Sequence, residues 1–316
     1  MNVTLILYES KYGTGEKIAK TLCPILGPAK TYNIEYAPEN IKYYSNIVFL
    51  FSLYGNDGGK KIVSYINENS IDLSKLKVGI ICVGLNKQDG LKKIEEFKKE
   101  INKKDTYDCF MEGELILDKL SNEDKEKVKV FCKDVSIPFE NMGDFKMENV
   151  LESGRSLREF FNTPNFIPPV TTIQKEIEKF VKSKNTCALA TGYGEFVRVT
   201  PIEYEYNEGK FYIISEGGLK FIGITQNEQL SLCIYENYTD MNNLCGIQIT
   251  GKVEVIEVWT EEYLDVLERK GLKIEAVSKL PFNMNILKIT PIKYEYLYSK
   301  FKHLGYDSKQ VYIPKD

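Results

Sequence analysis

The chain has 316 residues, of which 43% are hydrophobic, and its 42 basic and 45 acidic side chains give a net charge of −3. Chains of this length usually form two domains. The small negative charge gives no electrostatic reason to expect a nucleic acid or an anionic membrane as a partner. No apolar run approaches the length of a membrane span, and no basic segment precedes the first apolar run, so we expect a cytoplasmic protein.

Cysteine and histidine usage argues against several kinds of site. The seven cysteines form no CxxC pair, which disfavours zinc and iron–sulfur sites, and we assign no metal ligand. An odd number of cysteines without an export signal favours reduced thiols. The single histidine, His303, would have to carry any histidine-based triad or metal site alone, so the sequence identifies no catalytic residue.

Residues 1–134 alternate apolar runs with segments of helical spacing. The predicted strands are residues 3–8, 31–36, 46–52, 77–84 and 109–117. The predicted helices are residues 14–26, 58–68, 88–104 and 121–134. The strands at 46–52 and 77–84 are continuously apolar over most of their length, as expected for strands covered on both faces. Five strands with crossover helices predict an α/β domain with a doubly wound parallel sheet.

Residues 135–170 differ in composition. They contain four prolines and predict one helix, about 148–162, followed by an extended linker. From residue 171, one helix (171–184) precedes closely spaced strands. These are residues 186–191, 195–206, 210–215, 230–235, 245–257 and 285–298, with a helix at about 260–270 before the last. Short antiparallel strands separated by turn signals predict a small barrel. We therefore divide the chain into residues 1–134, a connecting segment 135–170, and residues 171–316.

Three loops follow predicted strands of the first domain and meet at the carboxyl edge of its sheet, where ligands bind. The first, in SKYGTGEK, opens a helix whose N-terminal amides and dipole favour an anion. The others are residues 52–56, where Tyr54 offers a ring face for stacking, and residues 83–86. The first loop is too short for a Walker motif, and no GxGxxG follows a strand. A mononucleotide therefore fits better than ATP or a dinucleotide.

The segments YESKYGTGEKIAK, FSLYGNDGG and VGIICVGL resemble a flavodoxin-like domain, in particular the branch that includes the menaquinone-dependent protoporphyrinogen oxidases. The resemblance covers roughly residues 1–134. It implies bound FMN, with the phosphate in the first loop and the flavin ring between the second and third. The implied phosphate ligands are Ser10, Lys11, Tyr12, Gly13, Thr14 and Gly15. The implied ring contacts are Leu53, Tyr54 and Gly55.

One position departs from the family pattern, which usually has Ser or Thr where this chain has Gly15. A lost hydrogen bond to a charged group costs about 1.5–3 kcal/mol, or roughly one to two decades in affinity. The alternative is a degenerate flavodoxin-like fold, in which this loop is only the start of a helix.

The second domain contains a candidate anion site of its own. Arg198 lies on a predicted strand and can contact a phosphate through two nitrogens. Ser215 ends the next strand, and Gly217-Gly218 exposes backbone amides before a short helix that carries Lys220. Because these groups lie on adjacent strands, we expect them to converge. The alternative is that Arg198 and Lys220 are solvated surface charges.

The motifs of this domain occur in the order ALATG, RVTP, FYIIS, LK and GIQITGK. This order, over about residues 171–300, resembles the pyridoxamine 5′-phosphate oxidase-like split barrel. The resemblance implies FMN bound across a dimer interface, and hence a homodimer. The implied FMN ligands are Arg198, Val199, Thr200, Ser215, Lys220 and Gln248, the last near the flavin edge. Two features depart from the family: basic residues are few after Ser215, and the C-terminal Arg/His pattern of the oxidase itself is absent.

Three functions remain open. In the first, the chain is an FMN-dependent flavoprotein oxidoreductase, whose barrel flavin acts on a small molecule while the flavodoxin-like domain relays electrons. The flavin itself would supply the redox chemistry. In the second, it is a non-enzymatic flavin-binding electron-transfer protein with a docking redox partner. In the third, only the barrel binds FMN and the first domain is an interaction module. Family likeness also suggests protoporphyrinogen oxidation, but the fused barrel argues against a simple transfer of that activity.

Overall fold

The computed structural model describes residues 3–55 and 58–315, and the chain divides into two compact units, Met1–Asn162 and Thr163–Asp316. Each unit has its own hydrophobic core and is described by itself. Asn56, in the second predicted loop of the first domain, lies outside the described residues. Among the helices of the described residues, none is both long enough and apolar enough to cross a bilayer.

The first unit is built on five parallel strands in the order β2-β1-β3-β4-β5. They are β1 (Thr4–Glu9), β2 (Ala29–Asn33), β3 (Asn46–Ser52), β4 (Lys77–Gly84) and β5 (Thr106–Glu112). The predicted doubly wound sheet is therefore confirmed. Strand order reverses between β1 and β3, and this topology places its ligand at that switch point. The continuous apolar runs form β3 and β4, which are buried over almost their whole length.

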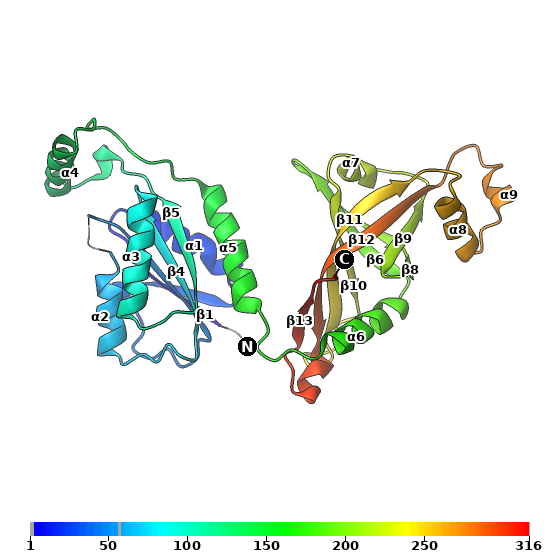
Figure 1. The fold of residues 1–316 in the computed structure, drawn as a ribbon, viewed down its shortest axis with the longest axis horizontal. Coiled ribbons are helices and arrows are strands. Elements are labelled where there is room, and N and C mark those ends of the chain that lie inside the picture. The colour runs from blue at the N-terminus through cyan, green and yellow to red at the C-terminus, as the bar shows by residue number, and fades with distance from the viewer. Residues whose placement is uncertain (1–2, 56–57, 316) are drawn as a thin grey trace. The chain divides into compact units, whose positions relative to one another are not determined.

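Four helices cover the two faces of this sheet (Figure 1). α1 (Thr14–Ile25) and α5 (Met147–Asn162) pack on one face, and α2 (Lys60–Glu68) and α3 (Lys87–Glu100) pack on the other. α5 contributes Val150, Leu157 and Phe161 to the core, because these residues recur at the spacing of one helix face. α5 therefore belongs to the first unit.

The connection from β5 to α5, residues 113–146, leaves the sheet at its carboxyl edge and contains α4 (Asn122–Asp134). Cys132 is the one buried residue of α4, so a hydrophobic core does little to hold this helix. The strand predicted at 109–117 runs over 106–112 instead. Glu112 pairs with Gly84, the last residue of β4, so the chain beyond it has no parallel partner to extend the strand.

The second unit is an antiparallel, curled half-barrel, which confirms the predicted split barrel. Its strands follow the order β7-β6-β10-β11-β12-β9-β8, with β13 paired to β12. They are β6 (Thr186–Tyr193), β7 (Phe196–Glu203), β8 (Glu205–Asn207), β9 (Lys210–Ser215), β10 (Gln229–Tyr235), β11 (Cys245–Ile256), β12 (Asn285–Tyr298) and β13 (Lys309–Tyr312). The helices of this unit are α6 (Val170–Lys182), α7 (Lys220–Ile224), α8 (Glu261–Arg269) and α9 (Ile274–Val277). α6 buries one face against the sheet, and the short α7 lies against β6 and β7.

The packing of α5 gives a testable prediction. Leu157 is 0% exposed in the core of the first unit, whereas Leu151 on the same helix is 50% exposed. Leu157→Ala should lower the free energy of unfolding by about 2–5 kcal/mol because it leaves a cavity. Leu151→Ala should change it by less than about 0.5 kcal/mol. Urea unfolding followed by circular dichroism measures both values, and equal losses would show that α5 is not packed as described.

Candidate functional site

Arg198 and Thr200 lie on the inner face of β7. The neighbouring strand β6 buries Cys187 and Leu189 in the core, and these residues pair with Ile202 and Thr200. Directly paired residues on antiparallel strands share a face. Thr200 therefore points inward, and so does Arg198 two residues earlier. Because β7 is an edge strand, Arg198 stays exposed at the opening of the half-barrel.

The turn between β9 and α7 forms the second half of this site. Ser215 ends β9, and its hydroxyl accepts the backbone N–H of Gly217 at 3.1 Å. Gly217 and Gly218 adopt φ angles of +135° and +108°, a conformation that residues with a side chain rarely adopt. α7 then packs on β6 and β7, and this places Lys220 close enough to Arg198 for their charges to interact.

Lys220 is a buried cation. Only 6% of the residue is exposed, its amine donates a hydrogen bond to the Gly217 carbonyl, and the amine lies 5.4 Å from the centre of the Phe221 ring. Burial, and after it the nearby Arg198 guanidinium, lower the pKa of Lys220 below its usual value. Within residues 3–55 and 58–315, no carboxylate forms an ion pair with Lys220 or Arg198. Two cations held together without an acid favour an anion.

Two buried threonine hydroxyls on this face have no hydrogen-bond partner. They are Oγ1 of Thr191 and Oγ1 of Thr200, and Thr191 pairs directly with Arg198 across the strands. α7 covers Thr191 so closely that a Cβ atom on Gly223 would lie 2.9 Å from the Thr191 Cβ. Buried polar groups are nearly always paired, so these two hydroxyls need a partner. A phosphate accepts hydrogen bonds from ammonium and guanidinium groups, so it fits Lys220 and Arg198. The two threonine oxygens, which are shielded from solvent, could join them only if they became uncovered.

Val199 and Gln248 lie on the other face of the sheet. Val199 follows Arg198 and is 61% exposed on the outer face. Gln248 pairs with Cys233 of β10, which pairs in turn with the outward-facing Ala188 of β6. A single chain therefore places the Val199 and Gln248 side chains away from Arg198.

Thr191 was missed by the sequence reasoning, although a signal was present. The hairpin turn pairs Tyr193 with Phe196, and this register places Thr191 opposite Arg198. Counting backwards from the turn glycine, Gly194, would have identified it.

The unpaired hydroxyl of Thr191 gives a testable prediction about the ligand-free protein. An orphaned buried hydroxyl costs about 1–3 kcal/mol, and an apolar group of the same shape removes that cost. Thr191→Val should therefore leave the free energy of unfolding unchanged or raise it.

The matched control is Thr260→Val, because the Thr260 hydroxyl caps α8 by accepting the Tyr263 N–H. This control should lose about 0.5–2 kcal/mol. Thermal denaturation in phosphate-free and flavin-free buffer compares the two variants. A destabilised Thr191→Val would mean that the hydroxyl has a structural partner.

The loop after β1 opens α1 without a capping side chain. Gly13 occupies the N-cap position with a φ angle of +89°, and it offers no side chain to the helix amides. The backbone N–H of Gly15 donates to the Ser10 hydroxyl at 3.1 Å. Ser10 therefore takes up one amide at the start of α1, and the other first-turn amides and the helix dipole are left to attract an anion.

Gly15 is needed for packing. A Cβ atom at this position would lie 2.9 Å from both Leu50 Cδ2 and Ser10 Cβ. The Ser or Thr that is usual in the family would fit only if one of these side chains moved. Glycine at residue 15 therefore allows Ser10 and Leu50 to pack directly against the start of α1.

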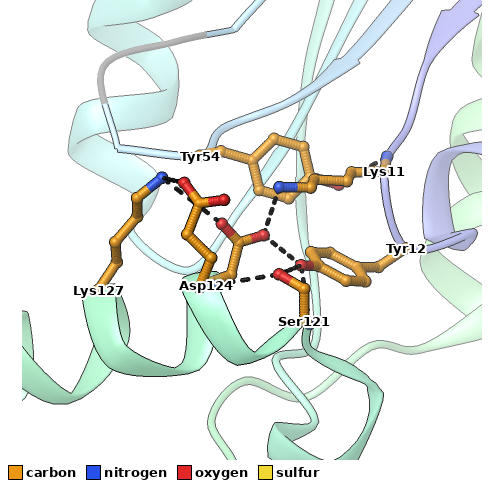
Figure 2. Close-up of polar contacts among 7 residues, drawn as sticks. Lys11, Tyr12, Tyr54, Ser121, Asp124 and Lys127 are labelled. Carbon is orange, nitrogen blue, oxygen red and sulfur yellow. Dashed lines mark hydrogen bonds and ion pairs between the residues drawn. The ribbon is translucent and has the colours of Figure 1, made fainter.

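Lys11 and Tyr12 are engaged by α4 (Figure 2). The carboxylate of Asp124 accepts hydrogen bonds from the Lys11 amine and from the Tyr12 hydroxyl. The Tyr54 hydroxyl accepts the Lys11 backbone N–H at 3.0 Å, and the Tyr54 and Tyr12 rings meet edge to face at 6.0 Å. The bonds from Lys11 and Tyr12 lower the pKa of Asp124, so this carboxylate stays ionised at neutral pH and the contact weakens only in strong acid.

The three residues predicted to contact the flavin ring, Leu53, Tyr54 and Gly55, differ in the groups that they could offer to it. Leu53 packs against the core and donates its N–H to the Val83 carbonyl at 2.8 Å. Gly55 has a φ angle of +64° and contributes backbone. Of the three, only Tyr54 presents an exposed side chain for a flavin ring. In the third loop, Asn86 caps α3 by accepting the N–H groups at the start of the helix.

Family comparisons agree with this architecture. Residues 5–136 match the flavodoxin domain family, and residues 173–298 match the pyridoxamine 5′-phosphate oxidase family. The chain thus consists of a flavodoxin-like domain followed by a pyridoxamine 5′-phosphate oxidase-like domain. This pair of domains indicates a flavin-binding protein.

Solved structures resemble parts of the chain at low identity. An FAD-binding protein from Mesorhizobium loti is 17% identical over 38% of this chain and 89% of its own, with a TM-score of 0.31. The heme storage protein HutZ from Vibrio cholerae is 16% identical over 37% and 89%, with a TM-score of 0.32. A putative pyridoxamine 5′-phosphate oxidase from Listeria innocua is 16% identical over 40% and 98%, with a TM-score of 0.33. Likenesses at these scores carry no argument about function. A search of curated proteins found no match.

Proposed function

We propose that the second unit binds FMN through its phosphate, and that the protein is an FMN-dependent flavoprotein oxidoreductase acting on a small molecule. The observation that carries this proposal is the pair of cations Arg198 and Lys220, without an acidic partner among the described residues and beside two unpaired hydroxyls. Bound FMN would supply hydride and single-electron chemistry, which explains why few catalytic side chains are needed.

Each residue of this site has a distinct task in the proposal. Arg198 gives a planar pair of donors that orients the phosphate. Lys220 supplies a compact positive charge. The hydroxyls of Thr191 and Thr200 would complete the donor set if they became uncovered, while Ser215 holds the turn that positions Lys220.

We also propose that the protein is a homodimer through the outer face of the barrel. Val197 is 80% exposed and Val199 61% exposed on this face, and Gln248 lies on the same face. Contact with a second copy would remove these valines from water. It would also bring Gln248 to a shared surface, where it could approach a flavin edge.

A relay role for the first unit requires a second FMN in its loop. The contact between Asp124 and the Lys11 and Tyr12 side chains favours the alternative, in which the barrel alone holds FMN in the resting chain. Counting FMN per chain separates these two readings.

We predict about one FMN per chain after reconstitution and gel filtration, measured from the visible spectrum and the protein concentration. Lys220→Met should weaken FMN binding roughly 10- to 100-fold, because it removes a charge-assisted contact. Lys279→Met is the matched control, since it removes the same charge from an exposed residue after α9 of the same unit. Equal binding by both variants, or no FMN on the wild-type protein, would refute the barrel site.

The lowered pKa of Lys220 predicts a pH dependence. A bound phosphate favours protonated Lys220, so its pKa is higher in the complex than in the free protein. Affinity should therefore be level while free Lys220 is protonated, and should fall as the pH rises through its lowered pKa. Flavin fluorescence titrations from pH 7 to 10 measure this fall. Lys220→Arg, which stays charged, should remove it.

An enzyme and an electron carrier differ in what reduces the flavin. Stopped-flow mixing with NADH or NADPH follows the bleaching of the flavin absorbance directly. Rapid reduction, followed by turnover of a small-molecule acceptor, supports the oxidoreductase. Reduction by a protein donor alone supports the non-enzymatic electron-transfer protein.

A further inference from the structure

Asp124 already supplies an anion to the loop after β1. Its carboxylate accepts hydrogen bonds from the Lys11 amine and the Tyr12 hydroxyl (Figure 2). The Tyr12 hydroxyl also accepts the backbone N–H of Ser121, the residue that caps α4, at 3.3 Å. Lys127, one turn further along α4, has its amine 3.9 Å from the second oxygen of Asp124.

Two of the side chains that the loop would offer to a phosphate, Lys11 and Tyr12, are the ones that Asp124 engages. In the described part of the chain, the Thr14 hydroxyl and the backbone amides at the start of α1 are not bonded to this carboxylate. Lys11 is the basic side chain within Ser10–Gly15, and the Ser10 hydroxyl is already bonded to the Gly15 N–H. A carboxylate and a phosphate that share the same donors would lie at hydrogen-bond range of each other, where two like charges repel strongly. The two anions therefore compete for the Lys11 amine and the Tyr12 hydroxyl.

The segment that carries Asp124 is anchored to the same edge of the sheet at other points. Gly143 approaches the loop after β4 so closely that a Cβ atom on it would lie 2.7 Å from Leu85 Cδ2. The Lys17 amine of α1 lies 4.9 Å from the centre of the Phe145 ring. Both contacts hold the end of residues 113–146 at this edge of the sheet, and α4 in the same segment is joined to the first loop through Asp124 and Ser121.

We propose that Asp124 determines the ligand specificity of the first unit: while its carboxylate bonds Lys11 and Tyr12, the loop excludes phosphate monoesters. FMN is then confined to the barrel, and the flavodoxin-like unit accepts a flavin only if the flavin lacks the phosphate. This inference rests on the proposed function in one respect, because FMN is taken as the phosphate-bearing ligand.

The test uses the full-length chain with Lys220→Met, which weakens the barrel site equally in every protein compared, so that differences in flavin affinity report on the first unit. Asp124→Asn and Asp124→Ser are two neutral variants that differ in size. Glu123→Gln is the matched control, because it removes the same charge from the adjacent residue, whose carboxylate is hydrogen-bonded to Lys127 and acts on Lys11 only through its charge. Each protein is titrated with FMN and with riboflavin, which lacks the phosphate, and circular dichroism checks that each is folded.

Both neutral Asp124 variants should bind FMN at least tenfold more tightly than the Glu123→Gln control, while riboflavin affinity changes by less than twofold. Equal FMN affinity in the variants and the control would overturn the proposal. So would an equal gain for riboflavin, since that result would mean that α4 blocks the crevice by its bulk. The FMN content of the wild-type protein tests the barrel site separately. A failure of the barrel proposal can therefore be told apart from a failure of the Asp124 proposal.

Discussion

A buried positive charge needs a counter-charge more than an exposed one, and the two units of this chain provide an example of each: Lys220 is 6% exposed, and the Lys11 side chain is 53% exposed. In the barrel, Lys220 is buried beside Arg198 with no acidic partner in the described part of the chain, so the counter-charge has to come from a ligand. In the flavodoxin-like unit, Asp124 supplies the counter-charge of Lys11 from within the chain. The buried Lys220 therefore needs an anion from outside the chain, whereas the half-exposed Lys11 already has one within it.

The order of elements and both sheet types could be predicted because they depend on local patterns. The continuous apolar runs of β3 and β4 require cover on both faces, and the glycine turns after residue 186 separate short strands. The end of β5 could not be predicted in the same way. Leu115, Ile116 and Leu117 continue the apolar character, but the strand stops where its partner β4 stops. The end of β5 depends on where its neighbour β4 ends, and a local sequence pattern contains no information about that tertiary contact.

For the candidate site too, residues near local sequence signals could be predicted, and residues placed by long-range contacts could not. Arg198, Ser215 and Lys220 were predicted to converge because they were expected on adjacent strands. That reason was wrong, since β7 and β9 are not neighbours in the sheet; the packing of α7 on β6 and β7 brings Lys220 near Arg198 instead. Asp124 could not be found, because it is far from Lys11 in the sequence and belongs to a helix with little burial. Gln248 lies on the outer face of one chain, so its predicted flavin contact depends on a second copy. The ligand roles of all these residues remain predictions.

The spacing between α7 and β6 has a consequence of its own. Two glycines face each other there, since a Cβ atom on Gly223 would lie 2.7 Å from the backbone nitrogen of Gly192. Any side chain at residue 223 would push the helix outward, and Lys220 would move away from Arg198 with it. The distance between Lys220 and Arg198, and with it the affinity of the site for an anion, therefore depends on how closely the α7 backbone at Gly223 approaches the β6 backbone at Gly192. Substitutions there would change the affinity by moving Lys220, without removing any donor group.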